Sequence, residues 1–167
     1  MNVFFESEVD LNDIFDFDIY EEIKRTIKET VDYLNCPYET EVNVLFTTNP
    51  EIQKLNMENR GIDKPTDVLS FPMIEWDSPC NFDFSEEDEI TLCNPDTGEL
   101  MLGDIVVSID KAIEQSKEYG HSLKREVLFL IAHSMLHLFG FDHMDDEERE
   151  KMESMQREIL NNIGVTR

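Results

Sequence analysis

The sequence predicts one α/β or α+β domain, in which strands and helices share a single core, and three observations support this. The chain of 167 residues has the length of one ordinary domain. Its hydrophobic content of 40%, with 10% aromatic residues, is enough to build a core. Strand-like and helix-like segments follow one another along the chain, which indicates a layered structure. No linker or internal repeat divides residues 1–167, so we expect a single domain.

The first half of the chain contains two strand-like and two helix-like segments. Residues 3–9 form the first strand-like segment. Over 20–34, apolar residues recur at spacings of four, four and three, which is typical of an amphipathic helix: Ile23, Ile27, Val31 and Leu34. Residues 41–47 alternate and are rich in β-branched side chains, as in a strand. The Asn-Pro pair at 49–50 then provides a cap and a first-turn proline for a short helix over 51–57.

The second half continues this order and contains the most apolar helix. We expect strands at 68–71 and 103–108, with a helix over 109–119 directly after the second of them. The next helix begins after its cap residue Ser122 and is apolar nearly all round, which places it at the centre of the fold. A polar helix over 145–162 ends the pattern. The chain therefore predicts a mixed sheet of about four strands packed with helices.

The chain is strongly acidic, and its charge is unevenly distributed. Asp and Glu number 38 against 14 Lys and Arg, which gives a net charge of −24. Proteins held on nucleic acid or anionic membranes by bulk charge need positive faces, so this class is excluded. Residues 1–23 and 65–110 together contain 20 of the acids and no Lys or Arg. The remainder is near neutral, and a site there can still face an anion.

Residues 75–99, within the second acidic stretch, resemble an insertion. They combine consecutive acids at 86–89 with clusters of Pro, Gly, Asn and Asp, which mark turns and loops. We expect an acidic loop whose charges face water. Three interspersed aromatic residues indicate that part of the loop packs on the body of the domain: Trp76, Phe82 and Phe84.

Cysteine usage and hydropathy favour a protein of the cytoplasm, not a membrane protein. The number of cysteines is odd and their spacing is wide, which suits reduced thiols better than a disulfide framework: Cys36, Cys80 and Cys93. No apolar run approaches the roughly 20 residues that a membrane span requires. Residues 1–10 lack the basic and apolar segments of a signal peptide.

Three of the four histidines fall within one short window near the end of the central helix. His133 and His137 are four apart, so on a helix they share one face, one turn apart. Two imidazoles at this spacing can bind one metal ion, and Gly140 permits the turn that brings His143 to the same ion. Three nitrogen ligands with one open position are typical of a catalytic zinc site. Asp142 is equally compatible with orienting a ligand and with a plain surface role.

The spacing His-x3-His-x5-His, with a glycine three residues after the second histidine, also occurs in metzincin proteases. Those proteases carry a glutamate directly after the first histidine as general base. Here that position is Ser134, which cannot act as a base near neutral pH, so proteolysis is the less favoured use of the site. The fourth histidine, His121, is interpreted as a surface or cap residue.

A second polar segment, residues 59–72, contains two cations ahead of the strand expected at 68–71. Its Gly, Asp and Pro residues predict a turn, which places Arg60 and Lys64 in a loop. The planar fork of Arg60 suits bidentate contact with a phosphate. A plain surface cation is the alternative interpretation of Arg60.

The window from His133 to His143 resembles the H-G-x-L-H-L-x-G-Y-D-H signature of the YbeY endoribonuclease family. Residues 59–72, with the run Pro-Thr-Asp-Val-Leu-Ser-Phe-Pro, resemble a second motif of that family, and the segment from Leu102 to Ile105 resembles its strand. There are three departures: Ser134 where glycine is usual, Phe141 where tyrosine is usual, and a longer acidic stretch at 75–99.

This resemblance implies a compact α+β fold in which the metal helix packs on a mixed sheet. It also implies a metal-dependent, single-strand-specific endoribonuclease of rRNA maturation, notably at the 3′ end of the small-subunit rRNA, and of ribosome quality control. One zinc ion per chain would be held by His133, His137 and His143. Arg60 would be the functionally required arginine, so we expect catalysis to depend on Arg60 and His133, with Lys64 as a further substrate contact.

Two other functions compete with the ribonuclease. One is a metal-dependent hydrolase of another substrate, such as a peptide, and the other is a non-catalytic ribosome-assembly factor. The net charge predicts weak affinity for bare RNA, carried by the metal and a few cations such as Arg60, Lys64 and Lys124. Access to single-stranded rRNA would then come through the small ribosomal subunit or its associated proteins.

Overall fold

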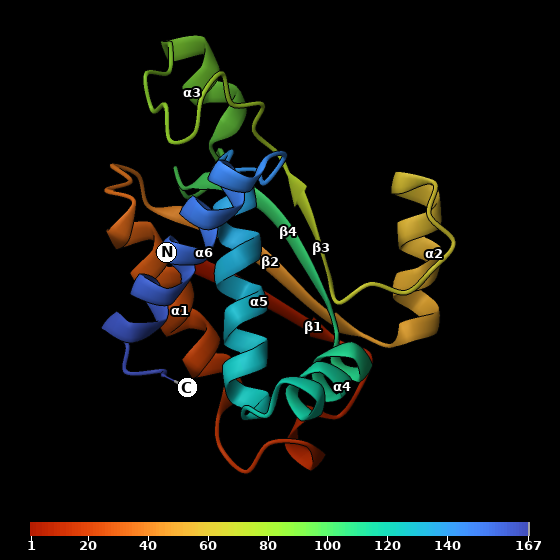
Figure 1. The fold of residues 1–167 in the computed structure, drawn as a ribbon. Helices are drawn as coiled ribbons and strands as arrows, with labels where there is room; N and C mark the ends of the chain where they lie inside the picture. The colour runs from red at the N-terminus through yellow and green to blue at the C-terminus, as the bar shows by residue number, and fades with distance from the viewer. Residues whose placement is uncertain (167) are drawn as a thin grey trace.

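Four strands form one mixed sheet in the order β1-β2-β4-β3 (Figure 1). The computed structural model describes residues 1–166. Strands β1, β2 and β4 run parallel, and β3 pairs antiparallel with β4 at one edge. The strands are β1 Asn2–Ser7, β2 Thr40–Thr47, β3 Val68–Pro72 and β4 Leu100–Ser108. The predicted α+β class and four-stranded mixed sheet are confirmed.

Six α-helices and one short 3-10 helix accompany the sheet in residues 1–166. They are η1 Leu11–Asp13, α1 Ile19–Tyr33, α2 Asn49–Arg60, α3 Glu86–Leu92, α4 Ile109–Tyr119, α5 Leu123–Leu138 and α6 Asp146–Asn162. Helices α1, α4 and α6 lie within one residue of their predicted bounds, whereas α2 is longer than the helix expected over 51–57. None of these helices is long and apolar enough to cross a bilayer.

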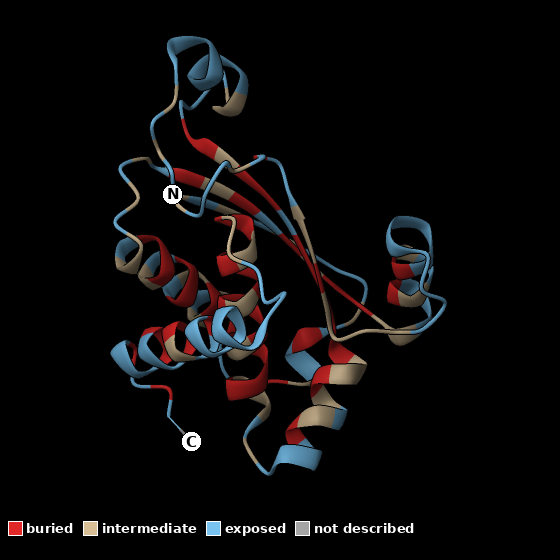
Figure 2. Ribbon diagram, turned by 45° about the horizontal axis from the view of Figure 1, so that its top comes forward, coloured by how far each residue is buried: buried red, intermediate tan, exposed pale blue. Residues whose placement is uncertain are grey.

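The two faces of the sheet are covered differently, and this positions α5. Ile105 and Val107 of β4 point into the main core, which lies between the sheet and helices α1 and α5. The alternating residue Val106 points to the other face and packs against Ile52 of α2. Helix α5 lies between the sheet, α1, α4 and α6, which explains its apolar sequence (Figures 1 and 2). Its predicted central position is confirmed.

Strands β3 and β4 approach so closely that one position requires glycine. Gly103 has a φ of +135°, and a Cβ there would lie 2.1 Å from the carbonyl oxygen of Phe71. The register of β2 with β4 also shifts between Glu41 and Val42, so that Val42 pairs with Gly103. A side chain at Gly103 would therefore force the two strands apart.

The acidic segment 75–99 is not all loop, because it contains the short helix α3. Ser85 caps this helix, and its side chain and that of Asp88 form a reciprocal capping box. Four acids in the first turn interact favourably with the positive end of the helix dipole, so the charge run stabilises the helix. The aromatic residues of the segment pack on the body as expected, with the rings of Trp76 and Phe82 against Phe139.

Candidate metal centre

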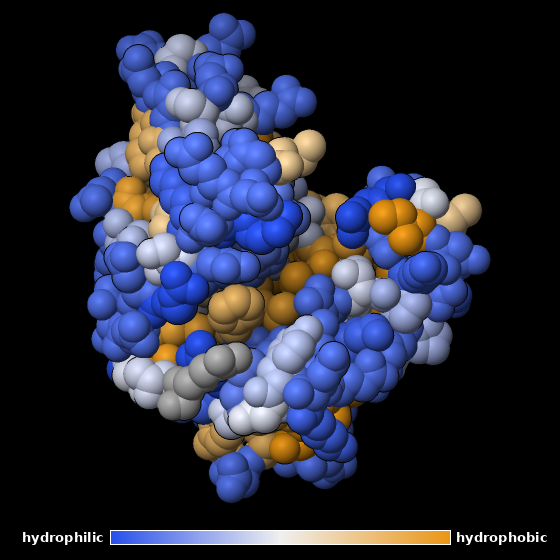
Figure 3. All heavy atoms as spheres, in the orientation of Figure 1, coloured by the Kyte–Doolittle hydropathy of each residue, from blue (hydrophilic) through white to orange (hydrophobic). Residues whose placement is uncertain are grey.

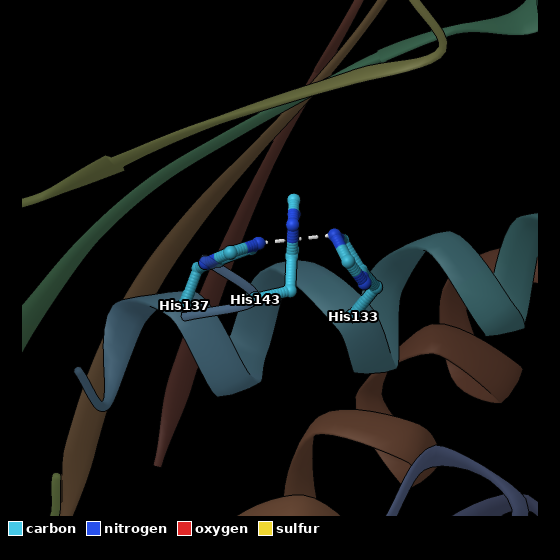
Figure 4. Close-up of side chains that lie close together, drawn as sticks. All are labelled: His133, His137 and His143. Carbon is cyan, nitrogen blue, oxygen red and sulfur yellow. Dashed lines mark hydrogen bonds between the residues drawn. The ribbon is translucent and has the colours of Figure 1, made fainter. Parts of the chain in front are cut away.

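Helix α5 places two histidines one turn apart on the single side where the helix is not fully buried. His133 and His137 are partly exposed, whereas most of their neighbours on α5 are buried. Their Nε2 atoms lie 3.0 Å apart (Figure 4). The predicted pairing of these side chains on one helix face is therefore what the structure shows.

A tight turn after α5 returns the third histidine to the same place. Gly140 has a φ of +93°, and a Cβ on it would lie 2.8 Å from Cβ and Cγ of Trp76, so both backbone and packing require glycine. The indole Nε1 of Trp76 donates to the carbonyl oxygen of Leu138, 2.8 Å away, at the end of α5. The ring of His143 then lies with its centroid 5.6 Å from that of His133 and 5.2 Å from that of His137.

Contacts on the far side of two rings orient the nitrogens that face each other. Nδ1 of His137 lies 2.9 Å from the carbonyl oxygen of Phe141, which can only accept, so Nδ1 carries the proton and Nε2 has a free lone pair. Nδ1 of His133 lies 2.7 Å from the side-chain amide of Gln156 on α6. If the amide turns its oxygen to Nδ1–H, His133 also presents a free Nε2 lone pair.

The surroundings keep the half-buried imidazoles of His133 and His137 neutral at pH 7. Burial, together with the nearby His137 and His143, lowers the pKa of His133 to about 4. Burial is also the largest cause lowering the pKa of His137, and its hydrogen bond to Phe141 opposes this. Neutral imidazole is the form that binds a metal, so both side chains are ready to act as ligands.

The three histidines fit a single metal ion. One ligand nitrogen from each lies within 4.8 Å of the other two, and no further His, Cys, Asp or Glu joins the group in residues 1–166. Tetrahedral bonds of the length zinc forms hold two nitrogens about 3.3 Å apart, close to the observed Nε2 separation. A set of three imidazoles suits zinc and similar transition metals better than magnesium or calcium. The group therefore provides three ligands and leaves room for a fourth.

Comparison with known proteins agrees with this site. A family model described as Endoribonuclease YbeY matches residues 5–164. The Endoribonuclease YbeY of Lachnoclostridium phytofermentans is 55% identical over 167 residues, which is 100% of both chains. The chain belongs to the YbeY endoribonuclease family. The resemblance read from the two sequence motifs is confirmed.

Other members of the YbeY family, and one solved structure, match over most of their length. The Endoribonuclease YbeY of Agathobacter rectalis is 50% identical over 100% of both chains. The solution structure of a Thermotoga maritima protein, 24% identical, covers 97% of this chain and 91% of its own chain, with a TM-score of 0.57. That similarity supports the fold.

In this YbeY family member, the position after the first histidine has no catalytic access. Ser134 is fully buried, and its Oγ has no hydrogen-bond partner in the described part of the chain. A hydroxyl enclosed in this way cannot exchange protons with a water on the open side of the histidines. Burial therefore adds a second reason, beside the chemistry of serine, why Ser134 cannot act as a general base.

The two predicted substrate cations lie on a different element from the histidines. Arg60 is the last residue of α2 and not part of a loop as expected, because Gly61 ends the helix with a φ of +69°. Lys64 lies in the loop that follows, as predicted. The guanidinium of Arg60 is exposed and donates to Oδ1 of Asn56, 3.4 Å away. Within residues 1–166, no hydrogen bond or ion pair joins either cation to the histidines.

Three further residues named from the sequence have other contacts. Oδ1 of Asp142 accepts from the backbone amide of His143 at 2.8 Å, and no hydrogen bond joins Asp142 to an imidazole in the described residues. The ammonium of Lys124 lies 3.1 Å from the carboxylate of Glu22. His121 was expected to be a surface or cap residue, and the surface alternative is wrong: its side chain is only 12% exposed and lies against the buried Glu126 of α5. Its backbone amide donates to the carbonyl oxygen of Ser116 at the end of α4, which agrees with the cap alternative.

Sequence reasoning missed Gln156, whose side chain contacts His133. It is 1% exposed and lies on the buried side of α6, beside Met155 and Ile159. The helix was expected to be simply polar. A glutamine within the stripe of apolar residues was the signal that could have singled it out, because a buried amide needs a polar partner.

Proposed function

We propose that this chain is a metal-dependent endoribonuclease that cleaves single-stranded RNA in rRNA maturation, notably at the 3′ end of the small-subunit rRNA, and in ribosome quality control. The observation that carries the proposal is the group of three histidines with room for a fourth ligand, in a chain of the YbeY family. Relatives that match over the full length are named endoribonucleases. The proposal joins that activity to this site.

We assign one zinc ion to His133, His137 and His143. When bound, such an ion acts as a Lewis acid toward a phosphoryl oxygen and lowers the pKa of a coordinated water toward about 7. The contact with Phe141 supports the assignment, because it directs the Nε2 lone pair of His137 toward the other two rings, while Gln156 contacts Nδ1 of His133 from the far side. His133 then serves catalysis as a ligand whose position α6 maintains.

Arg60 and Lys64 are assigned to the RNA backbone. An exposed guanidinium can bind the scissile phosphate and stabilise the charge that develops on it. The variant Arg60→Ala should retain its metal and lose cleavage by about 10²–10³-fold, the usual cost of removing one such donor. Lys54→Ala, on the same helix and paired with Glu51, is the matched control and should cleave normally. Normal cleavage by Arg60→Ala would remove the assigned role.

The deciding experiment removes and restores the metal. Protein stripped with a chelator is assayed on single-stranded RNA, on the duplex of the same sequence and on casein, before and after zinc is added back. We expect cleavage of the single strand alone, lost with the metal and recovered in proportion to the bound ion. Cleavage of casein would instead support a peptide hydrolase. Binding to ribosomal subunits with no metal-dependent cleavage of RNA would support an assembly factor.

We place this activity in the cytoplasm, on RNA presented by the small ribosomal subunit or its associated proteins. The odd number and wide spacing of the three cysteines support a reducing compartment. The net charge of −24 opposes binding to bare RNA, so a partner that presents the strand is favoured. Tight, salt-resistant binding of bare RNA by the isolated protein would contradict this placement.

A further inference from the structure

A cavity lies beside the three histidines, and none of the roles assigned so far involves it. Its volume is about 460 Å³, and its walls come from α4, α5, α6 and the residue before β3. Phe129 and Glu153 line both this cavity and the smaller one that contains His133 and His143. The two cavities are therefore neighbours along α5, and we refer to them together as the groove. Figure 3 shows this face hollowed, with hydrophobic residues visible between the more hydrophilic helices α6 and α4.

The groove leads away from the histidines along one side of α5. His133, Phe129 and Glu126 are spaced by four and three residues, so they lie along one face of the helix. Seven residues of α-helix rise about 10 Å. A strand held at the histidines would therefore pass the ring of Phe129 before it reaches Glu126.

The far end of the cavity carries polar groups that are fixed by the fold. The carboxylate of Glu126 is 3% exposed and lies 2.5 Å from Nε2 of His121, while Nδ1 of His121 is buried with no hydrogen-bond partner in the described residues. At another wall, the side-chain amide of Gln115 donates to the carboxylate of Asp67 at 3.3 Å. These polar groups, with the charged side chains of Arg125 and Glu153, surround the apolar surfaces of Tyr119, Phe129 and Leu130. Such a lining suits a flat heteroaromatic group with hydrogen-bonding edges.

Helix α6 adds two cations along the same groove. Arg149 lines the cavity of the histidines, and Arg157 lines the larger one. They are eight residues apart with Glu153 midway, so all three lie on one face of α6. Arg157 is exposed and forms no ion pair within residues 1–166. Eight helical residues rise about 12 Å, so cations at these two places can meet phosphates of one strand that are not adjacent, although Arg149 also lies 3.5 Å from Asp146.

We propose that the larger cavity is a nucleobase subsite, which takes one base of single-stranded RNA next to the bond cleaved at the metal centre. Phe129 would be its stacking surface, and Arg157 would contact the adjoining phosphate. Unpaired bases can leave the strand and stack on aromatic side chains, whereas a duplex keeps its bases inside the helix. The subsite therefore selects single strands, and in this respect it rests on the proposed ribonuclease function.

The test removes bases from the RNA and measures binding separately from cleavage. A short, fluorescein-labelled single-stranded RNA is made with an abasic site at each position in turn. Its affinity for the zinc-loaded protein is measured by anisotropy before cleavage is detectable, and cleavage is then followed on a gel. We expect one abasic position beside the cleaved bond to weaken binding by about 5- to 100-fold, the range that corresponds to one base stacked on an aromatic ring.

Two variants and one control assign that effect to the cavity. Phe129→Leu should bind intact RNA about 5- to 100-fold more weakly and should no longer distinguish intact RNA from the abasic RNA. Arg157→Gln, a change at an exposed position, should weaken binding of every RNA and reduce its salt dependence by about one phosphate contact. Arg25→Gln is the matched control, because Arg25 is an exposed arginine of α1 outside the groove.

Each outcome decides between the two proposals. Equal affinity at every abasic position would overturn the subsite, whether or not the RNA is cleaved. A penalty at one position that Phe129→Leu abolishes, with no metal-dependent cleavage, would support the subsite and refute the ribonuclease function. A penalty that persists in full in both Phe129→Leu and Arg157→Gln would place the base elsewhere and overturn the assignment. If the wild type neither binds nor cleaves RNA, both proposals are overturned, and cleavage at the same rate on every abasic RNA would overturn the subsite alone.

Discussion

Replacing Gly140 by alanine tests how the turn after α5 supports the third ligand. Gly140 adopts a left-handed conformation, with a φ of +93°. For a residue with a Cβ, this conformation lowers the free energy of unfolding by about 1–2 kcal/mol. The new Cβ would also lie 2.8 Å from two atoms of Trp76, so the indole or the turn must move. Overpacking of this kind costs about 1–3 kcal/mol. Together these costs predict a loss of about 2–5 kcal/mol in the free energy of unfolding.

Gly164→Ala separates the two costs. Gly164 has a φ of +77°, and no atom of residues 1–166 lies within 4 Å of the position that its Cβ would take, so this variant has the backbone cost alone. In urea unfolding, Gly140→Ala should be about 1–3 kcal/mol less stable than Gly164→Ala. For a chain of this size, each kcal/mol corresponds to about 2–4 °C in melting temperature.

The same variant should weaken metal binding. Movement of Trp76 would disturb its hydrogen bond to Leu138, and movement of the turn would carry His143 away from the other ligands. We expect zinc affinity, measured by competition with a chelator, to fall at least about tenfold in Gly140→Ala, as when a partner that orients a ligand is removed. Gly164→Ala should bind zinc normally. Equal stability and equal zinc affinity of the two variants would refute this account of the turn.

Three further predictions address the site itself. His137→Ala should lose stoichiometric metal in elemental analysis, and full retention would exclude the three-histidine site. Ser134→Ala removes a buried hydroxyl that has no hydrogen-bond partner among residues 1–166, so the free energy of unfolding should rise by about 1 kcal/mol with cleavage unchanged; a loss of cleavage would show that this hydroxyl does take part. In the metal-free protein, the pKa of His133 lies near 4 when folded against an ordinary 6.5, so the unfolded chain binds more protons between these values. Stability should therefore be complete above about pH 6.5 and fall by about 3 kcal/mol toward pH 4 in a series of urea titrations, and a flat profile would contradict the burial of a neutral imidazole.

Much of the fold could be predicted from the sequence because its elements have strong local signals. The apolar repeat of α1 and the alternation in β2 are set by residues close together in the chain, and the structure has both elements within one residue of their expected bounds. Gly120 marks the end of α4 for the same reason, since it adopts the left-handed conformation that stops a helix.

The errors arose where local signals compete or where partners are distant. Arg60 was expected in a loop because Gly61 and Pro65 follow it closely, yet only Gly61 ends the helix, one residue later. The acids at 86–89 suggested a solvated loop, although the same charges favour a helix N-terminus once Ser85 caps it. The surface alternative for His121 failed because no local pattern predicts the contact of its side chain with the buried carboxylate of Glu126.

The sequence by itself determined which three histidines meet and to which family the chain belongs. Residues at positions four apart on a helix, followed by a glycine and a third histidine, meet by local geometry alone, so no knowledge of the rest of the fold was needed. Tertiary structure decided what surrounds them. Gln156 of α6 contacts His133, Trp76 packs on Gly140, and the cavity beyond Phe129 is bounded by three helices. These contacts depend on how elements far apart in the chain pack together, and the spacing of residues in the sequence does not predict that packing.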